Sequence, residues 1–502
     1  MKIASRKLHT SHLTANDEAL LRCETALGQK DKAYCEGAQE TMRPLWRGIG
    51  ELPKTSGLHA SVAARVFLCV GILTGWIGSR NQIKGAQETA KNLISKSITY
   101  FESVGDQRQV AAARVELAYC YWRDGELNEA RTMLSEALKK LPSEGLTRAR
   151  ALLKLTTVEF SASRYEQALA ILTENAPTFA RITNHTTKGV YHGQIAITFR
   201  NLARNSEQKN EYLQRAVNEF EKADQEFKRA RNPVFRADVK NNVGLVLSNL
   251  SRFKEAHKYL DEARRLSVSF KDKARTAQYD ESSAQVFIAE GKFKEAESVA
   301  RRAARALEKV GHQCLVADAL ITQGIALARL HQTERAQFIF QRAIEVAYQI
   351  DALDKAGIAA LTMIEEISEL SPATLQAAYE RARAWLAESP SQELILRLGD
   401  AAGKLAASVH LEISAEEAMG ILLTKPGDLQ QKILEYEGAL IRRALTQANG
   451  SVTRAASLLG TSYQALCYMI ESRHKDLLKD RSPVRRRRSR KESTGKPNEE
   501  SA

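Results

Sequence analysis

Side chains that could contact a nucleic acid are concentrated between residues 453 and 491 of this 502-residue chain. Hydroxyl and amide groups can hydrogen-bond to base edges, and a Gln such as Gln464 can pair with adenine through two bonds. Basic groups attract phosphates. From Glu471 to Lys491 there are ten basic and three acidic residues, a net charge of +7 against +14 for the whole chain. The candidate contacts are Thr453, Arg454, Ser462, Tyr463, Gln464, Tyr468, Arg473, Lys475, Arg485, Arg486, Arg487 and Arg488.

Two short helices and a tight turn are predicted to position these groups. Asn449 and Gly450 tolerate the left-handed conformation that ends a helix. Ser451 can cap a following helix of about two turns. Gly460 can supply the turn and Ser462 can cap the next helix. This is the layout of a helix-turn-helix, whose second helix enters the major groove of double-stranded DNA.

The stretch from Tyr436 to Ile470 resembles the Fis-type helix-turn-helix, which also occurs at the C-terminus of bacterial enhancer-binding activators. The matching positions are Glu437, Leu440, Ile441, Ala444, Leu445, Gly450, Ala455, Ala456, Leu458, Leu459, Gly460, Ser462 and Leu466. The resemblance covers only some 35 residues of the chain. It implies DNA binding by a dimer. Those activators normally carry an ATPase module that this sequence lacks, so their energy-dependent activation is not implied.

The residues that form the helices and the turn match the family better than the residues that would contact DNA. Ser451 stands where the family usually has Asn, and the second helix carries Tyr463, Cys467 and Tyr468 where the family usually has Arg, Thr and basic residues. The basic tail could supply the phosphate contacts that this helix lacks. Two alternatives stay open: the segment is one more hairpin of a repeat protein, and the tail is a solvated, solubilising end.

The helix before the motif is a candidate for dimerisation. Asp428 can cap it, with Gln431 in the capping-box position. An apolar stripe with steps of 4, 3 and 4 is formed by Leu429, Ile433, Tyr436 and Leu440. In the Fis-type family this helix helps to form a homodimer, which would place two recognition helices on a palindrome. The alternative is that the stripe packs within the chain.

A repeat of about 40 residues determines the predicted fold of most of the chain. Alanines recur with steps of 40, 38, 48, 40, 40 and 40 at Ala90, Ala130, Ala168, Ala216, Ala256, Ala296 and Ala336. We expect the eight extra residues of the long step to form a longer turn around residues 205–211. The spacing of Ala118, Tyr121, Gly125, Ala130, Leu134, Ala137 and Pro142 resembles a tetratricopeptide repeat. The prediction is an all-α protein, with a tetratricopeptide-like α-solenoid of seven or eight hairpins wound into a right-handed superhelix.

Such an array presents a concave groove lined by the first helix of each hairpin, which suits a protein or peptide partner. The candidate groove residues are Arg123, Asn241, Leu245, Glu281, Gln285 and Arg329. Asn241 is of interest because an amide can bind a peptide backbone through both its donor and its acceptor. The alternatives are that the array only spaces other parts and that Asn241 is an ordinary surface residue.

Five regions are predicted: an N-terminal helical region (1–54), the superhelix (55–388), a helical connector (389–426), the Fis-type domain (427–480) and a disordered basic tail (481–502). The sequence has no phosphate-binding loop, dinucleotide motif, zinc-binding HExxH or nucleophile elbow. We therefore expect no enzyme, no cofactor and no metal site. The six cysteines show no metal spacing and are interpreted as buried thiols.

We expect a cytoplasmic protein that does not associate with a membrane. No signal peptide is apparent. The most apolar run, Val66 to Gly78, is shorter than the roughly twenty residues that a span needs. The combined hypothesis is a DNA-binding transcriptional regulator with a partner-binding superhelix. The alternative is a non-enzymatic scaffold with a degenerate helix-turn-helix, whose tail binds polyanions without specificity.

Overall fold

The computed structural model describes residues 12–408, apart from 388 and 390, and residues 429–480. Throughout these ranges the regular structure is helical, and no strand occurs. The chain divides into two compact units, residues 1–367 with 385–394 and residues 368–384 with 395–502.

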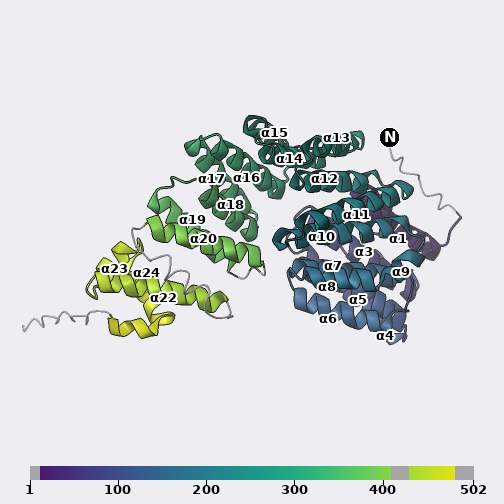
Figure 1. Ribbon diagram of the computed structural model, residues 1–502. Helices are drawn as coiled ribbons and strands as arrows, with labels where there is room; N and C mark the ends of the chain where they lie inside the picture. The colour runs from purple at the N-terminus through teal and green to yellow at the C-terminus, as the bar shows by residue number, and fades with distance from the viewer. Residues whose placement is uncertain (1–11, 388, 390, 409–428, 481–502) are drawn as a thin grey trace, which may run out of the picture. The chain divides into compact units, whose positions relative to one another are not determined.

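The first unit is built from consecutive helices joined mostly by short turns, with a longer connection over residues 43–59 (Figure 1). They are α1 (Ala15–Asp31), α2 (Cys35–Met42), α3 (Ala60–Arg80), α4 (Ala86–Ser103), α5 (Gln107–Arg123), α6 (Leu127–Lys140), α7 (Leu146–Ser161), α8 (Tyr165–Glu174), α9 (Ala176–Arg181), α10 (His185–Leu202), the 3-10 helix η1 (Ala203–Asn205), α11 (Lys209–Arg229), α12 (Pro233–Asn249), α13 (Phe253–Ser269), α14 (Lys273–Ala289), α15 (Phe293–Lys309), α16 (Gln313–Arg329), α17 (Thr333–Gln349) and α18 (Leu353–Glu366).

Successive helices of this unit pack in pairs, and the pairs stack. From α3 to α17 each hairpin joins a first and a second helix, as in α12 with α13, α14 with α15 and α16 with α17. The first helix of one hairpin also packs on the first helix of the next, for example α12 on α14, α14 on α16 and α16 on α18. This arrangement confirms the predicted tetratricopeptide-like α-solenoid.

Small residues allow the two helices of a hairpin to approach closely. All seven alanines of the repeat are fully buried. Opposite them, a Cβ atom added at Gly244 would lie 2.7 Å from Cγ of Leu260, and one added at Gly324 would lie 2.8 Å from Cε1 of Phe340. Leu260 and Phe340 stand four residues after their repeat alanines, one helical turn further along the same face. The repeat pattern therefore marks the helix crossings.

The 48-residue step of the repeat has a specific structural origin. After α10, the 3-10 helix η1 and a turn occupy residues 203–208, whereas three residues join α12 to α13. The second helix, α11, also has 21 residues, against 17 in α13. The extra residues thus form a longer connection, as predicted, but it occupies residues 203–208, and residues 209–211 of the predicted turn instead begin α11, which is about one turn longer.

Contacts distant in sequence connect the two ends of the α1–α14 segment. At the end of α1, Asp31 forms an ion pair with Arg150 of α7. Its carbonyl oxygen accepts a hydrogen bond of 3.1 Å from Nδ2 of Asn232, a fully buried residue that also caps α12. At the end of α3, Arg80 lies 3.5 Å from Asp272, the N-cap of α14. The solenoid therefore brings residues about 200 positions apart into contact.

Helix α3 is longer than the apolar run from Val66 to Gly78 that the sequence shows. Helix α3 has 21 residues and is, among the described residues, the one helix long and apolar enough to cross a membrane by length and composition. It is packed in the protein core, where Val66, Val70, Leu73 and Ile77 are completely buried. The helix is longer than the predicted apolar run because less apolar residues extend it at both ends.

The second unit contains most of α19 (Pro372–Leu386) and α20 (Gln392–Ser408), and all of α22 (Leu429–Gln447), α23 (Val452–Leu458), α24 (Tyr463–Ser472) and the 3-10 helix η2 (Lys475–Asp480). Helices α22, α23 and α24 and the 3-10 helix η2 share a core formed by Ile441, Ala444, Leu445, Ala448, Ala455, Ala456, Leu466, Ile470 and Leu477. Helix α20 belongs to the predicted connector, whose remainder after residue 408 lies outside the described residues.

Replacing Gly244 by Ala should destabilise the protein, because the new Cβ would crowd Leu260 and the carbonyl oxygen of Ala256, 3.2 Å away. Overpacking of this kind costs about 1–3 kcal/mol. The matched control is Gly193→Ala in α10, where no atom lies within 4 Å of the new Cβ. There the higher helix propensity of Ala should stabilise the protein by about 0.5–1 kcal/mol. Urea unfolding followed by circular dichroism measures both changes. A stabilised Gly244→Ala variant would contradict the role assigned to this crossing.

Candidate functional site

A pocket of about 410 Å³ opens on the first helices of three successive hairpins. Helix α14 contributes Gln278, Glu281, Gln285 and Ile288, and α16 contributes Leu315, Asp318, Ile321, Thr322 and Ile325. Leu307 of α15 and Ile358 of α18 complete the lining. This volume lies within the range of small-ligand and peptide side-chain pockets.

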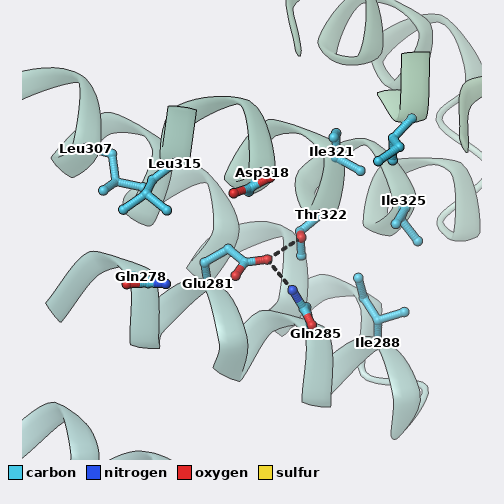
Figure 2. Close-up of a pocket in the computed structure, with 11 residues that line it drawn as sticks. Gln278, Glu281, Gln285, Ile288, Leu307, Leu315, Asp318, Ile321, Thr322 and Ile325 are labelled. Carbon is cyan, nitrogen blue, oxygen red and sulfur yellow. Dashed lines mark hydrogen bonds between the residues drawn. The ribbon is translucent and has the colours of Figure 1, made fainter. Parts of the chain in front are cut away.

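The polar centre of the pocket is the carboxyl group of Glu281, a residue only 6% exposed (Figure 2). Its Oε1 accepts hydrogen bonds of 2.6 Å from Nε2 of Gln285 and of 2.6 Å from Oγ1 of Thr322. Burial raises the pKa of Glu281, and the charge of Asp318 adds to this effect. The two hydrogen bonds and Lys355 oppose it without cancelling it.

Lys355, the cation whose charge acts on Glu281, already has an ion-pair partner. Nζ of Lys355 forms an ion pair with Asp318. Burial is the largest single influence and lowers the pKa of Lys355, but the charge and hydrogen bond of Asp318 and the contact with Cys314 together outweigh burial and leave this pKa raised. Glu281 has no ion-pair partner of its own within the described ranges. The site therefore holds a buried carboxyl group supported by neutral donors.

Aliphatic side chains flank the polar centre on both sides. Figure 2 shows Leu307 and Leu315 at one end, and Ile288, Ile321 and Ile325 at the other, with Glu281, Asp318 and Thr322 between them. All but Leu307 are half-buried and so remain accessible to a ligand. The pocket can bind a ligand by hydrogen bonds, charge and apolar contact.

Two of the six predicted groove residues, Glu281 and Gln285, are brought together in this pocket, and the other four lie elsewhere. Arg329 ends α16 in a two-pronged ion pair with Glu366, with distances of 2.6 and 3.0 Å. Arg123 places its guanidinium group 4.5 Å from the ring centroid of Tyr119.

On α12, Asn241 is buried and its Oδ1 atom has no hydrogen-bond partner. Leu245, one turn later, is half-buried against the core. Asn241 is therefore not the exposed surface residue of the alternative interpretation.

The sequence-based selection missed Gln278, Asp318 and Thr322. Two of them could have been found from the 40-residue period. Gln278 and Asp318 are polar residues at the same position of consecutive repeats, on the first helices that line the groove. Thr322 could not be selected in this way, because its role depends on a hydrogen bond to Glu281 from the neighbouring repeat.

In the second unit, two short helices, α23 and α24, follow α22 and are separated by a tight turn. Asn449 and Gly450 have φ values of 48° and 75° and end α22, and Gly460 has a φ of 61° between α23 and α24. Ser451 caps α23 by accepting a hydrogen bond from the backbone of Arg454, and Ser462 caps α24 through the backbone of Ala465 at 3.1 Å.

The candidate contacts on this motif are exposed. Leu466 and Ile470 bury one face of α24, whereas Tyr468 is 65% exposed on the opposite face and Tyr463, the first residue of the helix, is 48% exposed. Thr453, Arg454, Ser462, Gln464 and Lys475 are also exposed. Arg473 lies 3.6 Å from Glu437, a carboxylate that also contacts Arg383 of α19 and His474. Arg485, Arg486, Arg487 and Arg488 lie outside the described residues.

The predicted dimerisation stripe is partly covered within the chain. Ile433, Tyr436 and Leu440 are half-buried, and the side chain of Leu429 lies outside the described residues. Burial raises the pKa of Tyr436. Beside this stripe, Glu437 accepts a hydrogen bond of 3.2 Å from Arg383 of α19.

Across the described ranges, the cysteine, histidine and acidic side chains are dispersed, and the thiols differ in burial. No group of three His, Cys, Asp or Glu side chains forms a potential metal site in the part of the chain that the structure describes. Cys23, Cys69 and Cys120 are buried thiols, whereas Cys35, Cys314 and Cys467 are only half-buried, which corrects the prediction that all six are buried.

No family model and no curated protein matches the sequence. Among solved structures, the chain is similar to a signal transduction ATPase with a tetratricopeptide repeat sensor from Pyrococcus horikoshii, with 13% identity and a TM-score of 0.47 over 73% of this chain and 54% of that one. The chain thus matches about half the length of that ATPase. It is also similar to a Rap protein complexed with competence and sporulation factor (14% identity, TM-score 0.44, 68% and 99% covered). A third similar structure is the human IFIT1 dimer with m7Gppp-AAAA, with 16% identity and a TM-score of 0.43 over 93% of this chain and 94% of that one.

The substitution Glu281→Gln should stabilise the protein more at pH 7 than at pH 4. Because the folded-state pKa of Glu281 is raised, its favourable contribution exists below the unfolded-state pKa of about 4.3 and is lost as the pH rises toward the folded-state value. Gln avoids this loss and keeps an oxygen acceptor. Thermal unfolding of both proteins at the two pH values gives the difference, with the exposed Glu295→Gln as control. An equal shift in melting midpoint at both pH values would contradict the expectation.

Proposed function

We propose that this chain is a DNA-binding transcriptional regulator in which the repeat unit binds a protein or peptide partner. The observation that carries the proposal is the capped α23–turn–α24 motif, which exposes Gln464 and Tyr468 on the outer face of its second helix and Tyr463 at the start of that helix. A helix presented in this way can enter the major groove of double-stranded DNA.

Contacts to bases and to phosphates would come from different parts of the sequence. On α24, Gln464 offers an amide for base edges, whereas this helix has no Lys or Arg. Lys475 and the tail from Arg485 to Arg488 supply the positive charge for phosphates. A homodimer through α22 would place two recognition helices on a palindromic site. The proposed regulator is a cytoplasmic protein, not an enzyme, and uses no cofactor.

A second candidate function is a non-enzymatic protein-interaction scaffold. It is favoured by the composition of the exposed face of α24, where Tyr468 and Glu471 stand in place of cations. In that case the motif would pack against or recruit proteins, and the tail would attract polyanions without sequence preference.

Gln464→Ala should change the sequence preference of DNA binding. Full-length protein is mixed with random duplex DNA near physiological salt, and the retained duplexes are sequenced. We expect enrichment of a palindromic site, and a loss of about 1–3 kcal/mol of discrimination at one position of each half-site in the variant. Gln349→Ala, on the exposed surface of α17, is the matched control. Retention of DNA without any enriched site would favour the scaffold.

Replacing Arg485, Arg486, Arg487 and Arg488 by Ala should reduce the salt dependence of DNA binding. Each lost phosphate contact lowers the slope of log K against log salt by up to ~0.9. Binding of a fixed duplex over a series of salt concentrations measures the slope. Replacement of the same four residues by Lys, which keeps the charge, should leave it nearly unchanged. A slope equal to that of the unmodified protein in the Ala variant would exclude the tail from binding.

A further inference from the structure

We infer that the Glu281 pocket selects an extended peptide in which a basic side chain is flanked on each side, two residues away, by an aliphatic one. The inference rests on the proposed function, because it specifies the partner of the repeat unit. It concerns the pocket between α14 and α16 and is independent of the helix-turn-helix.

The charge of the pocket identifies the central side chain of the peptide. Glu281 is buried and receives hydrogen bonds only from the neutral groups of Gln285 and Thr322. The nearby cation, Lys355, is bound to Asp318. Two carboxyl groups therefore face one ammonium group, which leaves one negative charge for a ligand cation to balance. An ammonium or guanidinium group beside Glu281 would form a charge-assisted hydrogen bond in a water-poor site.

The arrangement of apolar residues identifies the neighbouring side chains. Along α16, the lining runs from Leu315 past Asp318 and Thr322 to Ile325, a distance of about 15 Å at 1.5 Å per residue. In an extended peptide, residues i−2, i and i+2 point to the same side and span about 13 Å. A basic residue at i thus reaches Glu281 while the aliphatic residues on either side meet the two apolar ends seen in Figure 2.

Because the protein is basic overall, a preference for a basic peptide can come only from groups within the pocket. The chain carries a formal charge of +14, so its overall field repels a cationic peptide. Selective binding of a basic peptide must therefore arise from local groups. An acidic peptide, in contrast, would be attracted by the whole molecule and would place a second carboxylate against Glu281.

The test uses the full-length protein and a labelled peptide, acetyl-Leu-Ser-Arg-Ser-Leu-amide, with binding followed by fluorescence anisotropy. Peptides with Gln or Glu in place of Arg are compared with it. We expect the Arg peptide to bind roughly tenfold to hundredfold more tightly than the Gln peptide, as is typical of a hydrogen bond between charged groups. Equal binding of the two, preference for the Glu peptide, or no binding of the Arg peptide would each overturn the inference.

Two variants connect this preference to named residues. Glu281→Gln should remove the discrimination between Arg and Gln peptides, while the exposed Glu295→Gln should retain it. Ile325→Ala should weaken the Leu-flanked peptide severalfold, and one of the two peptides with a single Leu replaced by Ala should be little affected by this substitution. Because Glu281→Gln is expected to be the more stable protein at pH 7, its loss of binding could not be attributed to unfolding. Unchanged discrimination in Glu281→Gln would overturn the assignment.

The DNA selection experiment separates failure of this inference from failure of the proposed function. An enriched DNA site without peptide discrimination would leave the DNA-binding proposal standing and reject the pocket assignment. Peptide discrimination without an enriched DNA site would support the pocket in a scaffold protein.

Discussion

The close approach of two helices at a small residue is the constraint on which the repeat unit depends. Each repeat alanine is fully buried, and opposite it Gly244 and Gly324 leave only enough space for Leu260 and Phe340. Interiors are packed at nearly crystalline density, so a crossing of this kind fixes both the separation and the register of the two helices. The fixed register then places equivalent positions of successive first helices side by side. The pocket is a product of this stacking, because residues 278 and 318, and likewise 285 and 325, stand one period apart on adjacent helices.

This regularity makes the exceptions within the pocket informative. A repeat scaffold can fill its inner face with aliphatic residues, as Ile321, Ile325 and Ile358 do. Glu281 departs from that pattern, and a buried carboxyl group without a cationic partner lowers the stability of the fold. A position that carries such a penalty is a candidate for function, since binding sites are where local stability is given up for recognition.

Local chemistry was predictable from the sequence and distant pairing was not. Ser451 and Ser462 cap helices as expected, because a cap joins a side chain to the backbone three residues later. The alanine period likewise predicted the solenoid, since every repeat presents the same crossing. The hydrogen bond from Thr322 to Glu281 and the ion pair from Arg329 to Glu366 connect residues about 40 positions apart. Which polar partners meet between neighbouring hairpins depends on side-chain rotamers, and residue spacing does not encode these.

The contact between Asp31 and Asn232 has a consequence for how the chain folds. In a solenoid whose repeats touch only their neighbours, unfolding can proceed one hairpin at a time from either end. Here the buried side-chain amide of Asn232, at the start of α12, donates a hydrogen bond to the carbonyl oxygen of Asp31 at the end of α1. Arg80 at the end of α3 forms an ion pair with Asp272 at the start of α14. Because these bonds join segments about 200 residues apart, they form only when the intervening hairpins are in place. The segment from α1 to α14 should therefore lose its structure as one cooperative block, unlike a simple linear array.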